Sequence, residues 1–322
     1  MQQFYAPGKL LITGEYAVLD GAWALALPTR LGQTLTVTPT QIQNNKPAVY
    51  WQSIDELGQV WLETELLYPN FMPGTAPINP EKLTLQRLFQ TIEQLNPSLS
   101  IFTQQPALQF TTRLQFNRHW GLGSSATLST LMATWAGVNA YQLNNTLFGG
   151  SGYDVAVALH AQPLLYRLPN AQNFTPDVQI LPNYNPPLAQ YLYFCYTGQK
   201  QNSRHAIEYY RQQGKHQHPN LIETISKLSL EIANATTLPQ FCQLITQHEN
   251  LIARCLNLPP LLQTPLLKGL PGAAKSLGAW GGDFVLVATE MPQTELKLRY
   301  FNKPHQVVLT YNQMIALLNE PL

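Results

Sequence analysis

Charged residues and cysteine are both scarce in this chain. Only 11% of its 322 residues are Asp, Glu, Lys or Arg, and the formal net charge is +1. Because no run of Lys and Arg occurs, the sequence predicts neither a nucleic-acid partner nor an acidic membrane surface. The three cysteines, Cys195, Cys242 and Cys255, show no metal-binding or redox spacing. Such sparse use is typical of a reducing compartment.

Long apolar runs are also absent. No stretch reaches the roughly 18 apolar residues of a membrane span, and the segment from Met1 to Tyr5 lacks the pattern of a signal peptide. We therefore expect a cytoplasmic protein that makes no membrane contact. The apolar share is nonetheless 45%, and 322 residues suffice for two domains with substantial cores.

Hydrophobic periodicity indicates two blocks of mixed structure. Apolar residues alternate over 107–116, as in a half-buried strand of an antiparallel sheet, and recur at helical spacing over 124–140. A stretch rich in Pro and Asn, 168–190, is predicted to cross between the domains. Strands separated from a run of helices favour an α+β fold. Further strands are expected at 4–13, 23–38, 190–197, 283–289 and 305–310, and helices at 203–213, 220–234 and 239–256.

A glycine turn leads into the predicted helix at 124–140. It comprises Gly121, Leu122, Gly123, Ser124, Ser125 and Ala126. Backbone N–H groups and the helix dipole at such a start favour phosphate. The spacing also fits the dinucleotide pattern G-x-G-x-x-A, but that site needs a buried parallel strand before it and an acidic residue about 20 positions on. No Asp or Glu occurs from residue 119 to 153. A purely structural helix start is the other alternative.

Two further positions carry candidate chemistry. Asp154 follows Ser151-Gly152-Tyr153, so its carboxylate lies on a glycine-bearing turn that can approach a ligand closely. Lys9 begins an otherwise apolar strand after Ala6-Pro7-Gly8, where a solvated edge charge is the simpler interpretation. The segment from Lys275 to Phe284 is rich in glycine, and on its own it is typical of a hairpin.

Taken together, these segments resemble the three motifs of the GHMP kinase superfamily. The first motif resembles Ala6 to Gly21, the second Gly121 to Ala126, and the third Lys275 to Asp283. The resemblance implies two domains, expected at 1–182 and 188–322. The first would be like ribosomal protein S5 domain 2 and the second ferredoxin-like, with the site in the cleft between them.

The resemblance also implies a role for each matched residue. Asp154 matches the catalytic base of the mevalonate kinase branch, and Lys9 matches the lysine that stabilises the charge of that base and of the transferring phosphoryl group. A lysine nearby keeps a carboxylate ionised. The turn from Gly121 to Ala126 matches the loop around the ATP phosphates. The substrate pocket is implied to include Glu15, Tyr16, Gly278, Ala279, Gly281 and Gly282.

Several residues depart from the family pattern. Tyr16 stands where mevalonate kinases usually carry histidine, Trp120 replaces a small residue, and Trp280 replaces a glycine of the third motif. The usual metal-binding glutamate is missing between the phosphate loop and Asp154. We therefore expect Ser125, Asp154 and water to hold Mg²⁺, the alternative being that Asp154 only forms a structural ion pair with Lys9.

The sequence thus predicts an ATP- and Mg²⁺-dependent kinase that phosphorylates mevalonate or phosphomevalonate in isoprenoid precursor synthesis. Two alternatives remain: a related kinase for homoserine or a sugar, and a nucleotide-binding relative with weak catalysis. The expected partner is a small-molecule acid, and the chain is expected to be a monomer or a homodimer.

Overall fold

The computed structural model describes residues 1–41, 48–74, 77–99, 107–169, 175–200, 203–213, 220–281 and 283–316. The chain forms two compact units, each built from segments that are separate in sequence. The first unit comprises Met1–Gly8, Leu31–Arg118 and Gly123–Ala161, and the second comprises Lys9–Arg30, His119–Leu122 and Gln162–Leu322. The domain boundary expected between 182 and 188 stays a prediction.

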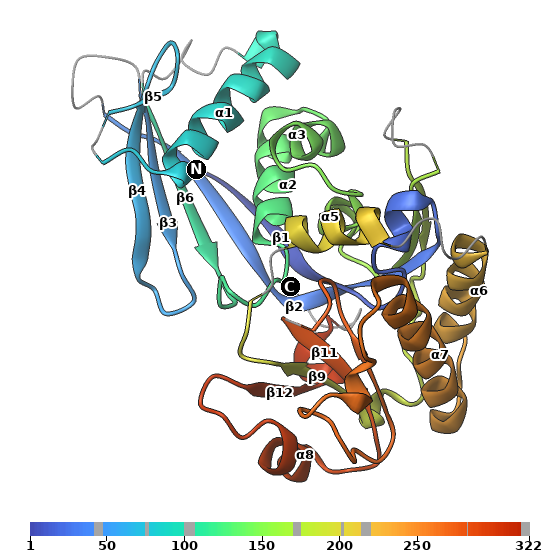
Figure 1. The fold of residues 1–322 in the computed structure, drawn as a ribbon. Coiled ribbons are helices and arrows are strands. Elements are labelled where there is room, and N and C mark those ends of the chain that lie inside the picture. Colours follow the sequence, from blue (N-terminus) through green and yellow to red (C-terminus); the bar gives the residue numbers. More distant parts are fainter. Residues whose placement is uncertain are drawn as a thin grey trace. The chain divides into compact units, whose positions relative to one another are not determined.

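The first unit is a sheet packed against helices (Figure 1). Its strands lie in the order β5-β4-β3-β6-β2. The elements are β3 (Ala48–Ile54), β4 (Val60–Leu67), β5 (Met72–Pro73), β6 (Ala107–Leu114), α1 (Pro80–Leu95), α2 (Ser124–Ala136), α3 (Ala140–Leu147) and α4 (Tyr153–His160), together with parts of β1 (Gln2–Leu11) and β2 (Ala24–Pro39), which continue into the second unit.

The alternation predicted before the glycine turn is present in β6. Phe110, Thr112 and Leu114 are buried, whereas Arg113 between them is exposed. The expected antiparallel pairing is present with β2, but β6 also pairs parallel with β3, so the sheet is mixed. The buried face of β6 packs its aromatic residue, Phe110, against Trp51 and Phe89, which lie at centroid distances of 5.8 and 5.2 Å.

The second unit contains the strands β7 (Leu164–Arg167), β8 (Asp177–Ile180), β9 (Leu192–Tyr196), β10 (Ala273–Ser276), β11 (Phe284–Ala288) and β12 (Val307–Thr310), and the helices α5 (Ser203–Gln213), α6 (Leu221–Ala233), α7 (Leu238–Leu256), α8 (Gln293–Tyr300) and α9 (Tyr311–Met314). Four of these strands form an antiparallel sheet in the order β10-β11-β9-β12, with helices following β9 and β11 in the chain. This strand–helix–strand–strand–helix–strand arrangement is ferredoxin-like, as the resemblance implied.

The stretch expected to cross between domains contains a strand that the sequence did not indicate. β8 pairs antiparallel with β7, and β7 pairs with the beginning of β2. The ladder is reinforced at its end by the side chain of Arg167, which donates a 3.0 Å hydrogen bond to Asp177. The periodicity of β8 was obscured because it is only four residues long and is half-buried or exposed throughout.

Within the described residues, no helix is both long and apolar enough to cross a membrane.

Candidate phosphate and acceptor site

In the first unit, α2 begins at a glycine and has no side-chain cap. Gly123 is the N-cap, with a left-handed φ of 89°, and as a glycine it has no side chain to accept a hydrogen bond from the first turn. The first N–H groups of a helix have no intrahelical partner. They remain available to an anion, which the helix dipole also favours. Ser124 is half-buried and Ser125 is exposed beside these groups, whereas Ala126 is buried in the core.

The turn that carries Asp154 has the same construction. Gly152 is the N-cap of α4 with φ 82°, again without a side-chain cap, and Asp154 lies in the first turn. The amide of Val155 donates a 3.0 Å hydrogen bond to the Asp154 carboxylate. The two glycine-capped helices, α2 and α4, pack against each other in the first unit. The positive end of α4 favours an ionised carboxylate at this position.

Tyr141 of α3 is a neighbour of Asp154 that the sequence analysis did not identify. Burial raises the pKa of Tyr141 to about 12, and the negative charge of Asp154 acts in the same direction. The phenol therefore stays protonated at neutral pH and can donate a hydrogen bond. Nothing in the spacing of Tyr141 along the chain marks it.

Two asparagines of α3, Asn144 and Asn145, lie between the glycine turn and Asp154 in the sequence and differ in their surroundings. Asn144 is buried, and its side-chain oxygen accepts a 2.8 Å hydrogen bond from Ser129 of α2. Asn145 is exposed on the same helix. Nowhere in the described part of the chain do three His, Cys, Asp or Glu side chains gather as a metal cluster.

In the second unit, Lys9 is bonded to the residues that precede α2. Its backbone N–H donates to the Leu122 carbonyl oxygen at 3.0 Å, and its ammonium group donates to the Gly121 carbonyl oxygen, also at 3.0 Å. Gly121 has φ 68°, and a Cβ there would lie 2.2 Å from a carboxylate oxygen of Asp283. A side chain at position 121 would therefore require the Asp283 side chain to move, and the second and third motifs are in contact at Gly121 and Asp283.

Trp120 anchors the same turn to the four-stranded sheet. Its ring meets Phe284 of β11 edge-on, at a centroid distance of 5.6 Å, and lies 6.1 Å from Tyr196 of β9. The Tyr196 hydroxyl donates a 3.3 Å hydrogen bond to the His119 carbonyl oxygen. The large side chain at position 120 is thus accommodated by aromatic packing within this unit.

The glycine-rich third motif forms the connection between β10 and β11. Gly278 and Gly281 adopt left-handed φ values of 71° and 72°, with no described atom within 4 Å of the place that a Cβ would take, and Ala279 is buried. Gly282 lies outside the described residues. The amide of Leu277 donates to Phe284 at 3.1 Å, which closes the base of the hairpin.

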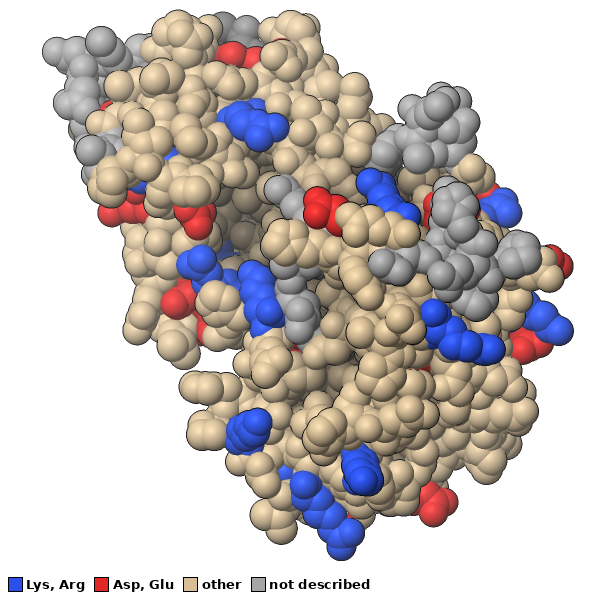
Figure 2. Space-filling model, in the orientation of Figure 1, with Lys and Arg blue, Asp and Glu red and all other residues tan. Residues whose placement is uncertain are grey.

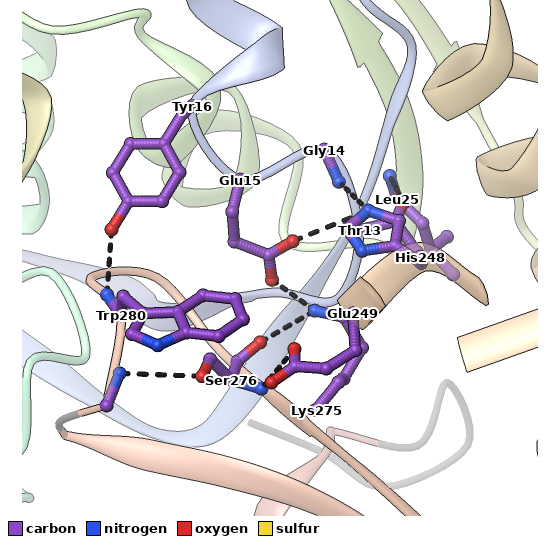
Figure 3. Close-up of polar contacts among 11 residues, drawn as sticks. Thr13, Gly14, Glu15, Tyr16, Leu25, His248, Glu249, Lys275, Ser276 and Trp280 are labelled. Carbon is purple, nitrogen blue, oxygen red and sulfur yellow. Dashed lines mark hydrogen bonds and ion pairs between the residues drawn. The ribbon is translucent and has the colours of Figure 1, made fainter. Parts of the chain in front are cut away.

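Glu15 belongs to a buried polar cluster (Figure 3). The Lys275 ammonium bonds to one Glu15 oxygen and donates a 2.7 Å hydrogen bond to the Ser276 carbonyl oxygen. His248 lies 3.5 Å from the other Glu15 oxygen. Glu249 accepts hydrogen bonds from the amides of Ser276 and Leu261 at 3.0 and 3.2 Å.

The ionisable groups of this cluster are strongly perturbed. Burial raises the pKa of Glu15 and raises that of Glu249 to about 7, with Lys275 opposing both shifts. Burial also lowers the pKa of His248 well below its ordinary value, so the imidazole is neutral. Because its Nε2 accepts a 2.9 Å hydrogen bond from Gly14, its proton is on Nδ1, which has no partner among the described residues.

Tyr16 is also buried, with 6% of its surface exposed. Its hydroxyl accepts a 2.7 Å hydrogen bond from the amide of Trp280, and its ring stacks on Tyr210. The Trp280 side chain packs against the apolar cluster that contains Tyr16 and Tyr210. The structure therefore brings Glu15 and Tyr16 to the third motif through buried contacts.

The sequence analysis missed His248 and Glu249 as members of this cluster. Both lie on α7, whose apolar stripe predicted the helix and placed His248 on its buried side. A single polar residue in such a stripe is the only signal that sequence offers.

On the face drawn in Figure 2, charged side chains are scattered, in keeping with the low charge of the chain.

Comparisons with known proteins find similarity in fold but not in sequence families. No protein-family model and no curated protein sequence matches the chain. Among solved structures, it is similar to the Methanococcus jannaschii mevalonate kinase (17% identity, TM-score 0.66), with 96% of each chain covered. It is also similar to the Streptococcus pneumoniae phosphomevalonate kinase in complex with phosphomevalonate and AMPPNP (16%, TM-score 0.68), covering 96% of this chain and 100% of that one.

A third similar structure is the Lactococcus lactis galactokinase complexed with galactose (12% identity, TM-score 0.64), with 96% of this chain and 92% of that one covered. The α+β architecture of this chain is therefore that of the GHMP kinases, as the motifs predicted.

Proposed function

We propose that this chain, which has the GHMP kinase fold over nearly its whole length, transfers the γ-phosphoryl group of ATP to mevalonate or phosphomevalonate. The observation that carries the proposal is the start of α2. Its glycine N-cap leaves the first N–H groups without a side-chain cap, and two serines accompany them. This is a site for phosphate oxygens.

Each candidate residue has a role that suits its surroundings. Asp154, in the positive first turn of α4, would accept the proton of the acceptor group, which is a hydroxyl in mevalonate and a phosphate OH in phosphomevalonate. The acceptor oxygen then bonds to the γ-phosphorus, the bond from phosphorus to the β,γ-bridging oxygen breaks, and ADP leaves with the electron pair. Lys9, whose ammonium is held at the Gly121 carbonyl, would stabilise the charge of the transferring group.

The donor set fits Mg²⁺ bound together with nucleotide. Mg²⁺ prefers oxygen ligands, keeps several waters and often takes one carboxylate plus substrate phosphates. Ser125, whose side chain is exposed, and Asp154 would supply the protein oxygens. When bound, the ion would neutralise phosphate charge.

The most specific part of the proposal is the identity of the molecule that accepts the phosphoryl group. The run Ser-Gly-Tyr-Asp-Val-Ala at 151–156 and the Gly-Gly-Asp ending at 281–283 look more like phosphomevalonate kinase. The similar structures also include a galactokinase, so a sugar or homoserine acceptor is the second candidate.

An acceptor panel tests the proposal. ADP release would be followed with Mg²⁺ and ATP in the presence of mevalonate, phosphomevalonate, homoserine or galactose. We expect release above the acceptor-free rate with one of the first two. Release only with homoserine or galactose would overturn the acceptor assignment. ATP binding without release for any acceptor would indicate a nucleotide-binding relative that lacks catalysis.

A further inference from the structure

Three consecutive residues of the first motif are bonded to three different segments of the second unit (Figure 3). The Gly14 amide donates to His248 of α7 at 2.9 Å. The Glu15 carboxylate pairs with Lys275 at the end of β10, and the Tyr16 hydroxyl accepts the Trp280 amide at 2.7 Å. Residues 15 and 16 therefore hold both ends of the segment Leu277–Trp280.

Tyr16 is held in a backbone conformation that a side chain of this size rarely adopts. Its φ is 59° and its ψ is −48°. Such a residue persists only where its surroundings determine it. Here the ring is stacked on Tyr210 with centroids 5.3 Å apart, and the hydroxyl is fixed at Trp280. Strain of this kind often accompanies a residue whose direction matters for function.

Among the described residues, the segment held by these contacts makes few hydrogen bonds within its own hairpin. The amide of Leu277 pairs across the hairpin, and the amide of Gly281 reaches the Ser276 hydroxyl only at 3.4 Å. Between them, Gly278 has a left-handed φ, and its backbone is hydrogen-bonded to the Glu15 carboxylate. The Tyr16 hydroxyl and the Glu15 carboxylate therefore both hold the backbone of this segment, together with the packing of the Trp280 side chain.

We infer that Tyr16 is a positioning residue that, with the Glu15–Lys275 pair, fixes the glycine-rich segment 277–281 for acceptor binding. The inference rests on the proposed function and on the resemblance to the third motif, which implies that this segment shapes the acceptor pocket. Tyr16 acts through the backbone of Trp280 and does not itself touch the acceptor. Loss of its hydroxyl should therefore affect the acceptor more than ATP.

A matched pair of variants tests this inference. Tyr16→Phe and Tyr210→Phe each remove one buried hydroxyl from the same ring stack, and the Tyr210 hydroxyl donates to Asp20 at 2.8 Å and not to the third motif. In Tyr16→Phe, we expect the Trp280 amide to exchange with deuterium about five- to ten-fold faster, as loss of one net hydrogen bond predicts. The acceptor KM should rise by about five-fold or more, with the ATP KM unchanged.

Tyr210→Phe should leave amide exchange at Trp280 and both KM values as in the wild type. The inference is overturned if Tyr16→Phe exchanges like the wild type, if its acceptor KM is unchanged, or if both variants behave alike. Should the wild-type chain release no ADP with any acceptor, the proposed function fails. The exchange rate of the Trp280 amide then still decides whether Tyr16 holds the segment.

Discussion

The ammonium group of Lys9 donates a 3.0 Å hydrogen bond to the carbonyl oxygen of Gly121, 112 residues further along the chain. The same lysine bonds through its backbone to Leu122. Its charge is thereby held at the residues that lead into α2. A lysine at the start of a strand is usually a solvated charge at the sheet edge. Lys9 differs because its ammonium group is bonded to the protein backbone.

Replacing the glycine at the start of α2 should weaken nucleotide binding. Gly123 and Gly137 both have left-handed φ values, 89° and 64°, at the two ends of this helix. An alanine at either position brings a comparable strain of about 1 kcal/mol. In Gly123→Ala, the added methyl group also disturbs the N–H groups of the first turn, so we expect ATP affinity to fall about ten-fold.

Titration calorimetry with ATP, together with thermal unfolding, would measure both effects. Gly137→Ala is the control, because it should lose stability without losing affinity. Equal ATP affinities in folded Gly123→Ala and in the wild type would contradict a phosphate site at this helix start.

Mg²⁺ should bind only with nucleotide. Asp154 is accompanied by no metal cluster among the described residues, so free protein offers too few charged ligands. We expect no heat of Mg²⁺ binding to the free protein and clear binding once a non-hydrolysable ATP analogue is present. Tight binding to the free protein, or full activity in excess EDTA, would show that the metal assignment is wrong.

Glu249 should make stability depend on pH. Burial raises its pKa from an ordinary 4.5 to about 7 in the folded protein. Between these values the folded state binds a proton that the unfolded chain releases, so the contribution of Glu249 to stability falls as pH rises. Glu249→Gln removes this dependence, while His248 titrates in both proteins and cancels from the difference.

Urea unfolding at pH 5 and pH 8 would measure this effect. Between these pH values, the wild type should lose about 2–3 kcal/mol of unfolding free energy relative to Glu249→Gln. A constant difference between the two proteins would mean that Glu249 is ionised throughout this range.

Lys275 should be essential for stability because it faces two buried carboxylates. Removing one partner of a buried ion pair leaves an uncompensated charge, so Lys275→Met should cost about 3–5 kcal/mol. Adding Glu15→Gln should recover part of that loss. The exposed Lys227, which lies 3.8 Å from Glu231, is the control, and Lys227→Met should change stability by less than about 1 kcal/mol. Strictly additive losses in the Lys275/Glu15 double variant, seen in urea unfolding, would contradict the pairing.

Sequence predicted those parts of the fold that depend on local pattern. The alternation in β6 and the apolar stripe of α7 each reflect one buried face, which periodicity detects directly. β8 has no such signal, because it is short and is stabilised by pairing with β7.

The candidate site shows the same division. The glycine turn of α2 and the Asp154 turn are local features, and their left-handed glycines follow from sequence. The pairing of Glu15 with Lys275 joins residues 260 positions apart, and the burial of both depends on the tertiary fold. Single-sequence patterns therefore could not show that Glu15 belongs to a buried cluster.

The most direct test of the account is single-turnover ADP release by the wild type and by Asp154→Asn with Mg²⁺, ATP and the preferred acceptor. Asp55→Asn is a matched control, since the Asp55 carboxylate accepts hydrogen bonds from the amides of Leu57 and Gln59 in the turn between β3 and β4. Loss of a positioned base predicts a fall of about 100-fold or more in Asp154→Asn, with ATP affinity nearly unchanged and Asp55→Asn as active as the wild type. An Asp154→Asn variant that keeps more than about a tenth of wild-type turnover would contradict the account.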